Sequence, residues 1–136
     1  MEKKDIKKVL KVQQEIANET LAYESLTEIL TDASFINPIR RMIEERKKHL
    51  RILETITGTE VVPKDSDMKY VKRIYKIFGI KRLFSNLETV MKEKGKDTAS
   101  LMKTYPSVKE IHQAESRYQT TFHKLAALEK KKQKLQ

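Results

Sequence analysis

Apolar residues recur at intervals of three and four along the first, second and fourth long segments of this chain, and in the third two apolar rows flank Glu88. Ionisable side chains interrupt each run near its middle. In the first run Glu19 stands among Val9, Val12, Ile16, Tyr23, Leu26 and Leu30. Such spacing is typical of a helix face packed against other helices. Arg46 with His49, Glu88 and Glu115 interrupt the following runs. Charged side chains are rarely buried unless paired or metal-bound, so we predict that these residues meet in one polar core site.

The composition predicts a single all-α domain over residues 1–136. Glycine and proline each occur 3 times and charged residues make up 35% of the chain, which favours long helices. The absence of cysteine excludes disulfides, thiolate nucleophiles and iron–sulfur clusters. No integral membrane segment is expected, because no run approaches the ~20 apolar residues of a membrane span. The N-terminal sequence MEKKDIKK lacks the apolar core of a secretory signal, which predicts a cytoplasmic protein.

The formal net charge of +10 raises a further alternative, a basic adaptor that binds nucleic acid or an anionic membrane surface. The simpler interpretation is a solvated, lysine-rich surface. The basic residues are scattered, and no aromatic platform for stacking bases accompanies them.

The apolar runs and their breaks predict a four-helix bundle with a short extra helix before the third long helix. The first helix is expected over residues 5–30, and the second follows the turn at 31–38 and ends at Gly58. The short extra helix is expected over 67–78. The third long helix starts at Ile80, and the fourth runs from Val108 to a basic tail at 130–136. Asp32 or Ser34 is the expected cap of the second helix and Pro38 a first-turn residue. Gly79 should bend the chain, and Gly95 should loosen the helix that contains it.

The positions of the turns support a shared site. The first hairpin turns near Ser34, which is equally far along the chain from Glu19 and His49. At ~1.5 Å per residue, both side chains come to the same height on antiparallel helices. In the second hairpin, counted from a turn near Tyr105, Met91 and Tyr118 match in height, and Glu88 and Glu115 lie within about a turn of them on opposite sides.

The sequence resembles rubrerythrin-like proteins of the ferritin-like superfamily, and most of all the N-terminal ferritin-like domain of vacuolar-iron-transporter-family proteins. The similarity runs from about Ile16 to Leu125. It rests on ANETLAY, IEERKKHLRILETITG, YVKRIYKIFGIKRLF and TYPSVKEIHQAESRY. The resemblance implies a ferritin-like bundle, a homodimer, and a role in iron handling or defence against peroxide.

Carried over by position, the resemblance makes Glu19, His49, Glu88 and Glu115 metal ligands. Carboxylate-bridged di-iron bundles take a glutamate from each of two helices and a Glu-x-x-His pair from each of the others. Iron or another divalent metal would be the cofactor. Tyr23 and Tyr118 lie one turn from Glu19 and Glu115, within reach of hydrogen bonds to them.

Three positions depart from the family pattern. Arg46 stands where the bridging glutamate belongs, Tyr118 where the second histidine belongs, and Met91 where some relatives carry a further acid. A guanidinium stays protonated and cannot bind a cation, so Arg46 is expected to pair with the carboxylates. Glu45 is expected at the surface, as are His112 and His123.

These departures predict a degraded di-iron site in a non-catalytic binding or structural module. A residual single-metal site built on Glu19, His49 and Glu115 is the intermediate interpretation. The enzymatic alternative is a functional di-metal oxidoreductase or ferroxidase, a non-haem iron enzyme that uses Glu19, His49, Glu88 and Glu115. The missing bridging carboxylate and the missing second histidine argue against enzyme activity without deciding it.

Overall fold

The structure, a computed structural model, describes residues 3–135, and this part of the chain contains five α-helices and no strand. The helices are α1 (Lys3–Ile29), α2 (Ala33–Thr57), α3 (Ser66–Phe78), α4 (Ile80–Leu101) and α5 (Val108–Leu135). The predicted all-α class and the short extra helix are confirmed. Residues 1, 2 and 136, the ends of the predicted domain and tail, lie outside the described residues.

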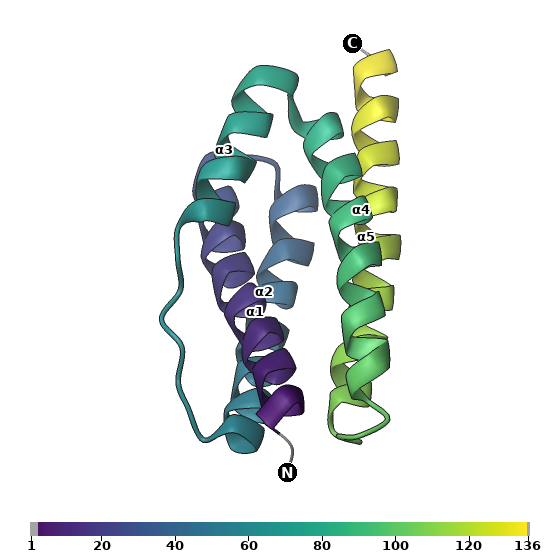
Figure 1. Cartoon of the computed structure of the whole chain (residues 1–136). Coiled ribbons are helices and arrows are strands. Elements are labelled where there is room, and N and C mark those ends of the chain that lie inside the picture. Colours follow the sequence, from purple (N-terminus) through teal and green to yellow (C-terminus); the bar gives the residue numbers. More distant parts are fainter. Residues whose placement is uncertain (1–2, 136) are drawn as a thin grey trace.

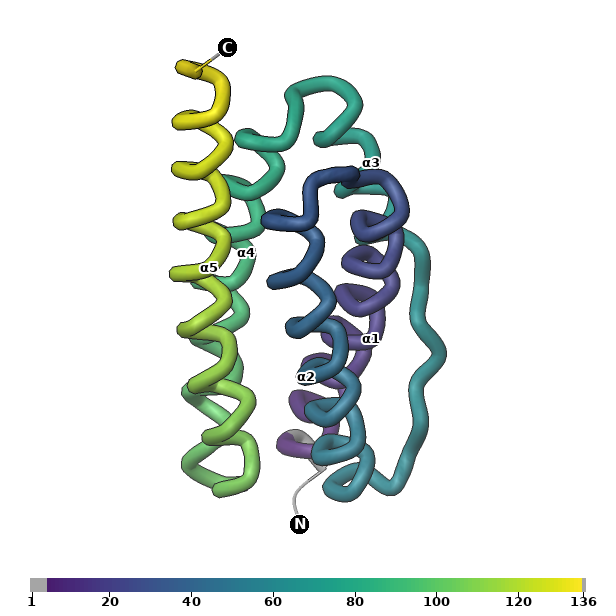
Figure 2. The backbone as a smooth tube through the Cα atoms, turned by 180° about the vertical axis from the view of Figure 1, so that it is seen from behind, coloured from purple at the N-terminus to yellow at the C-terminus, as the bar shows by residue number. Residues whose placement is uncertain are grey.

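Two antiparallel helix pairs, α1 with α2 and α4 with α5, lie side by side (Figures 1 and 2). The segment after α2 and helix α3 run back along the bundle, so that α4 starts at the end where α2 starts (Figure 1). The four long helices therefore form two hairpins joined by one long crossover. No helix within residues 3–135 combines the length and apolar character needed to cross a membrane.

The start of α2 is fixed by Asp32, whose carboxylate accepts hydrogen bonds from the Ser34 backbone N–H at 2.9 Å and the Ser34 hydroxyl at 2.6 Å. This confirms the predicted cap. The expectation for Pro38 is wrong: it lies inside α2, beyond the first turn. Gly58 ends the helix with φ of 71°, a left-handed conformation that favours glycine.

Three polar side chains of α1 hold the extended segment after α2 against the bundle. Gln13 donates to the Thr59 carbonyl at 2.6 Å and Gln14 to the Val62 carbonyl at 2.9 Å. Asn18 accepts from the Lys64 backbone N–H at 2.7 Å. These bonds satisfy backbone groups that have no helical partner, and they place α3 against α1.

The two glycines of the second half behave differently from each other. Gly79, with φ of 87°, ends α3 and begins α4, as predicted. Gly95 does not loosen its helix, because α4 continues without a break to Leu101. Gly95 is buried, and a Cβ there would lie 3.8 Å from Gln119 and 4.0 Å from His112 of α5. These are ordinary van der Waals distances, so the packing of α4 on α5 leaves room for a Cβ at this position.

The core consists of two hydrophobic clusters separated by a polar layer. One cluster contains Leu26, Phe84 and Phe122, and the other contains Ile16, Leu53 and Ile111. On α1, α2 and α5 the ionisable core residues lie at the boundary between the clusters. Buried there are Glu19, Arg46, His49 and Glu115. The predicted polar site therefore lies near mid-height of the bundle.

Candidate functional site

Arg46 of α2 is the centre of the polar layer, and its side chain is fully buried. Its Nε donates to Glu19 Oε2 at 2.9 Å and its Nη2 to Glu19 Oε1 at 3.1 Å, a two-point contact with α1. The same Nη2 donates to Glu115 Oε2 of α5 at 2.8 Å. A planar guanidinium can bind two carboxylates in this way, whereas an ammonium group cannot reproduce the geometry. Arg46 thus joins three helices.

Every carboxylate oxygen of Glu19 and Glu115 accepts a hydrogen bond from a protein group. Lys94 of α4 donates to Glu19 Oε1 at 2.8 Å, alongside Arg46. Thr98, also of α4, donates its hydroxyl to Glu115 Oε1 at 2.6 Å. The remaining two oxygens bind Arg46. The acceptors that a metal ion would need are therefore already occupied by donors.

His49 is held as a neutral imidazole by its contact with Arg46. Arg46 Nη1 lies 3.2 Å from His49 Nδ1, and arginine can only donate, so Nδ1 must carry the lone pair. The ring proton then sits on Nε2, a buried atom with no hydrogen-bond partner within the described residues. Burial lowers the pKa of His49, and the nearby Arg46 lowers it further, to about 4.

The cluster is electrically balanced at neutral pH. Burial alone would raise the pKa of Glu19, but Arg46 and Lys94 hold it at about 2. Burial alone would lower the pKa of Arg46, yet Glu19 and Glu115 raise it above its ordinary value. Two cations therefore face two carboxylates around a neutral histidine. Such compensation is what makes ionised groups tolerable in a core.

Of the three positions that differ from the ligands expected by resemblance, Tyr118 and Met91 both contact the third, Arg46. The ring of Tyr118 lies on the Arg46 guanidinium, with Cζ 5.0 Å from the ring centroid. Met91 Sδ is 3.8 Å from Arg46 Nη2. An arginine, the aromatic ring that covers it and a soft sulfur atom beside it thus occupy adjoining space.

The two tyrosines do not make the hydrogen bonds expected of them. Tyr118 donates its hydroxyl to Glu45 Oε1 at 2.6 Å, not to Glu115. The buried hydroxyl of Tyr23 makes no hydrogen bond of normal geometry within the described residues. Burial and the negative charge of Glu19 raise the pKa of Tyr23 well above its ordinary value. Both phenols therefore stay protonated at neutral pH.

The structure does not bring Glu88 to the cluster. Its side chain is 37% exposed and its Oε1 lies 3.1 Å from His123 Nδ1 at the surface. The face of α4 that enters the core follows Leu87, Met91, Lys94, Thr98 and Leu101, one position away from Glu88. Of the four predicted ligands, Glu19, His49 and Glu115 are thus gathered around Arg46, and Glu88 is separate.

Sequence reasoning missed Lys94, Thr98 and His112. His112 is half-buried and not at the surface as expected; its Nδ1 lies 3.1 Å from Thr98 Oγ1, whose own hydrogen is used by Glu115. The signal for Lys94 and Thr98 was present in the sequence, because Leu87, Met91 and Leu101 continue through them at spacings of three and four. Glu88 is next to Leu87 and does not belong to this repeat, so it lies on a different face of the helix.

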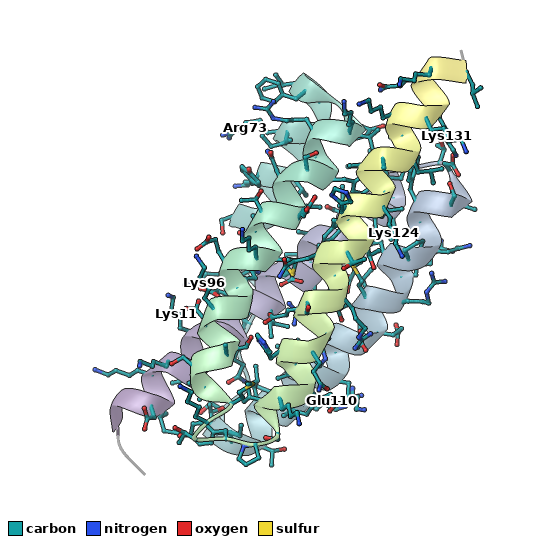
Figure 3. The ribbon with its side chains drawn as sticks, turned by 90° about the vertical axis from the view of Figure 1, so that its right-hand side faces the viewer. Lys11, Arg73, Lys96, Glu110, Lys124 and Lys131 are labelled. Carbon is teal, nitrogen blue, oxygen red and sulfur yellow. The ribbon has the colours of Figure 1, made fainter. Side chains whose placement is uncertain are left out.

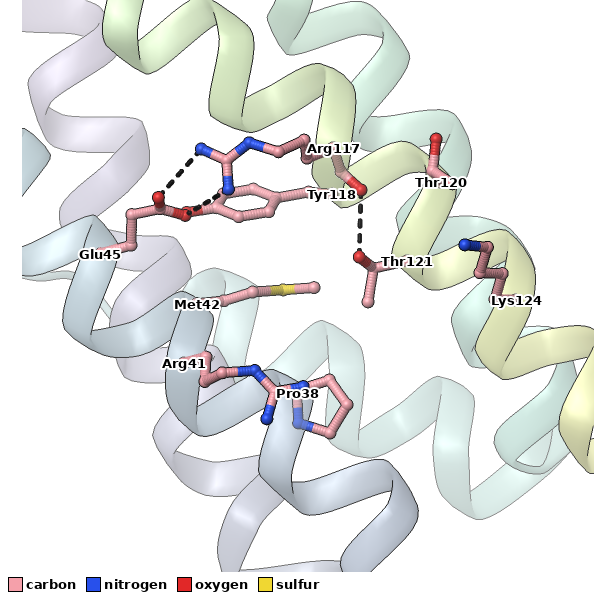
Figure 4. Close-up of a pocket in the computed structure, with 9 residues that line it drawn as sticks. All are labelled: Pro38, Arg41, Met42, Glu45, Arg117, Tyr118, Thr120, Thr121 and Lys124. Carbon is pink, nitrogen blue, oxygen red and sulfur yellow. Dashed lines mark hydrogen bonds and ion pairs between the residues drawn. The ribbon is translucent and has the colours of Figure 1, made fainter.

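A cavity of about 510 Å³ opens between α2 and α5, beside the cluster (Figure 4). On its wall Glu45 is bound by Arg117 at 2.9 Å and by the Tyr118 hydroxyl, contacts that lower the pKa of Glu45 although burial alone would raise it. Glu45 is half-buried and not fully at the surface as expected. Met42 and Pro38 line the cavity from α2, the same helix that carries Glu45. The lining contains no histidine and no free carboxylate, so it offers no acid–base pair.

The donor set does not fit a pair of metal ions. A guanidinium lies between the two buried glutamates, a phenol stands at the second histidine position, and Glu88 is elsewhere. Within residues 3–135 no group of three or more histidine, aspartate or glutamate side chains is placed to hold a metal ion. A fixed cation among the carboxylates would also repel an incoming one.

Comparisons with protein-family models, with curated proteins and with solved structures find no match to this chain. The interpretation of the cluster therefore depends on the chain's own residues and geometry.

The titration of His49 predicts that the protein loses stability as the pH falls from about 6.5 to about 4. The unfolded chain binds a proton on His49 in this window and the folded chain does not, so unfolding is favoured as the pH falls. For one proton the slope reaches about 1.4 kcal/mol per pH unit. Urea unfolding at a series of pH values measures it.

The matched variant is His49→Gln, which keeps a polar side chain and removes the titration. Its stability should change less than that of the wild type between these pH values. Glu19, with a folded-state pKa of about 2, adds a further loss only below its ordinary value of 4.5 in both proteins. Identical pH profiles for the two proteins would contradict the assignment of a neutral buried His49.

Proposed function

We propose that this chain is a diverged ferritin-like bundle in which Arg46 has replaced a di-iron centre as the neutralising charge, and that it acts as a binding or structural module. The observation that carries the proposal is the contact of Arg46 with Tyr118 and Met91. Each of the three differs from the ligand expected at its position. Substitutions that fit together in space indicate that the interior was rebuilt around a new charge and not merely damaged.

The connectivity of the helices also supports a ferritin-like origin. Two antiparallel hairpins joined by one long crossover is the arrangement of that class of bundle, and this chain has it in α1–α2, the crossover with α3, and α4–α5. The resemblance further suggests a homodimer and a part in iron handling or oxidative-stress defence. We propose that the chain contributes to such a role by binding other molecules and not by catalysis.

The enzymatic alternative, a di-metal oxidoreductase or ferroxidase, is less well supported. It needs open coordination positions and several free carboxylates. Glu19 and Glu115 have all their oxygens engaged, and the lone pair of His49 faces Arg46. A single-metal site would have to displace Arg46 from both glutamates. That would leave a guanidinium buried without its partners, which is costly.

Metal analysis of protein purified without chelators tests the proposal. We expect well below one iron, manganese or zinc ion per chain after exchange into metal-free buffer. Added Fe(II) should be oxidised by air no faster in the presence of the protein than in its absence. An unrelated protein of similar net charge serves as the control for adventitious binding.

Approximately two irons per chain, together with accelerated oxidation of Fe(II), would overturn the proposal in favour of the ferroxidase. Approximately one tightly held metal ion without such oxidation would indicate the single-metal site. In that case spectroscopy of the Co(II)-substituted protein, compared with His49→Gln, would show whether His49 is a ligand.

A further inference from the structure

The turn between α3 and α4 carries two large apolar side chains that the fold leaves mostly exposed. Ile77 is 62% exposed and Phe78 is 58% exposed, and Gly79 turns the chain immediately after them. The turn projects at the end of the bundle where α5 also ends (Figure 1). Exposed apolar groups of this size at a projecting turn are typical of a contact surface.

The exposure is not a result of α3 lacking a packing partner. Val71 is buried, and Ile74 and Tyr75 pack against the main apolar cluster. The inner face of the helix is thus already used by the bundle. Ile77 and Phe78 lie beyond that face, so burying them requires another molecule.

Basic residues surround the turn without acidic neighbours in sequence. No aspartate or glutamate occurs from Met68 to Leu87, and six exposed basic residues do. We call this set, with Ile77 and Phe78, the basic corner; its charged members are Lys69, Lys72, Arg73, Lys76, Lys81 and Arg82. Within residues 3–135 Lys69 is the one member with a carboxylate partner, Asp65 at 3.3 Å.

Basic residues of α5 extend this charge across the same end of the molecule. Lys131 and Arg73 lie at that end in Figure 3, on α5 and α3 respectively. Lys130 and Lys134 follow on the last turns of α5 and are exposed. An anionic plane facing this end would therefore meet positive charge from two separate elements.

We infer that the basic corner binds an anionic phospholipid bilayer, with Ile77 and Phe78 inserted among the lipid headgroups and the surrounding basic residues on the phosphates. Apolar tips within a basic ring match an interface that is apolar beneath a negatively charged surface. This goes beyond the proposed module by naming a surface and its partner.

Two other occupants fit the corner less well. A second copy of this chain docked through it would bring two basic corners together, and the carboxylates beside the turn, Asp32 and Glu129, are too few to offset them. A nucleic acid would attract the lysines but would not use Ile77, and the face of Phe78 is taken by Arg82, whose Cζ lies 5.5 Å from the ring centroid. Tyr70 accepts a hydrogen bond from Asn86. A nucleic acid would thus find reduced stacking surface at Phe78, whereas a bilayer would use both apolar side chains of the turn.

Co-sedimentation with vesicles tests the inference. At physiological salt the protein should bind phosphatidylcholine vesicles that contain phosphatidylserine and should bind pure phosphatidylcholine poorly. Ile77→Ser with Phe78→Ser should weaken binding roughly tenfold or more, because the inserted groups are lost while the charge stays. Lys76→Gln with Lys81→Gln should reduce the preference for phosphatidylserine.

Val62→Ser is the matched control, because Val62 is apolar and even more exposed, at 81%, but lies in the segment along α1. Its binding should equal that of the wild type. All variants replace exposed side chains, and thermal unfolding confirms that each is folded. Failure to bind phosphatidylserine vesicles overturns the inference. So does binding that Ile77→Ser with Phe78→Ser leaves unchanged, or tighter binding to single-stranded RNA than to the vesicles.

Discussion

Replacing Arg46 with methionine should lower the free energy of unfolding by about 3–5 kcal/mol, measured by urea denaturation. The substitution keeps most of the side-chain volume and removes the donors that satisfy Glu19 and Glu115. Both carboxylates would remain buried: Glu19 would keep its ion pair with Lys94, and Glu115 would lose its ion pair with Arg46. An uncompensated buried charge is among the most destabilising changes a core can undergo.

Two further variants show whether the loss comes from the orphaned charges. Arg51→Met removes an exposed arginine from the same helix and should change stability by less than about 0.5 kcal/mol. Arg46→Met combined with Glu19→Leu and Glu115→Leu should recover most of the loss, because an apolar core of similar volume is often as stable as a buried ion pair. If Arg46→Met alone costs under about 1 kcal/mol, Arg46 does not hold these acids.

Arg46→Glu with Tyr118→His should convert the cluster into a metal site. Without metal this variant should be less stable than Arg46→Met, because like charges ~4 Å apart repel by roughly 4 kcal/mol at an effective dielectric constant of about 20. Added Zn(II), Mn(II) or anaerobic Fe(II) should stabilise it, by about 4 kcal/mol at about 1,000 times the dissociation constant. Unfolding midpoints with and without metal measure the effect.

Two controls accompany this variant. The wild-type midpoint should not respond to the same metals, since Arg46 remains in place. Arg46→Glu with Tyr118→Phe supplies the carboxylate without the second imidazole and should bind metal more weakly. A double variant with equal midpoints in metal and in chelator would mean that the ligand positions are mapped incorrectly.

Much of the fold follows from the apolar spacing. The runs on α1, α2 and α5 predicted which face enters the core, because each has one continuous repeat and a clear turn at its end. Asp32 and Gly58 marked the limits of α2 by their capping chemistry. The burial of Glu19, Arg46 and Glu115 also followed from their places in these runs, as did the pairing of Arg46 with carboxylates.

The errors concentrate on α4, where two rows of apolar residues made two helix phases look similar. The packing of Leu87 and Met91 decides between them, and it turns Glu88 outward and Lys94 inward. Which face of α4 enters the core depends on how the two hairpins pack together. The spacing of apolar residues within one helix does not determine that packing. The same holds for Tyr118, whose ring direction is set by Arg46 and whose hydroxyl is set by Glu45.

Arg46 of α2 contacts side chains of α1, α4 and α5 at a single level of the bundle. These contacts fix the heights of the four long helices relative to one another. Sliding any helix by one turn, about 5.4 Å, would pull it out of reach of its contacts. Motions that separate the helices at their ends leave this middle level in place. Deformations of this protein should therefore be hinge-like openings at either tip, and longitudinal shear between helices should be absent.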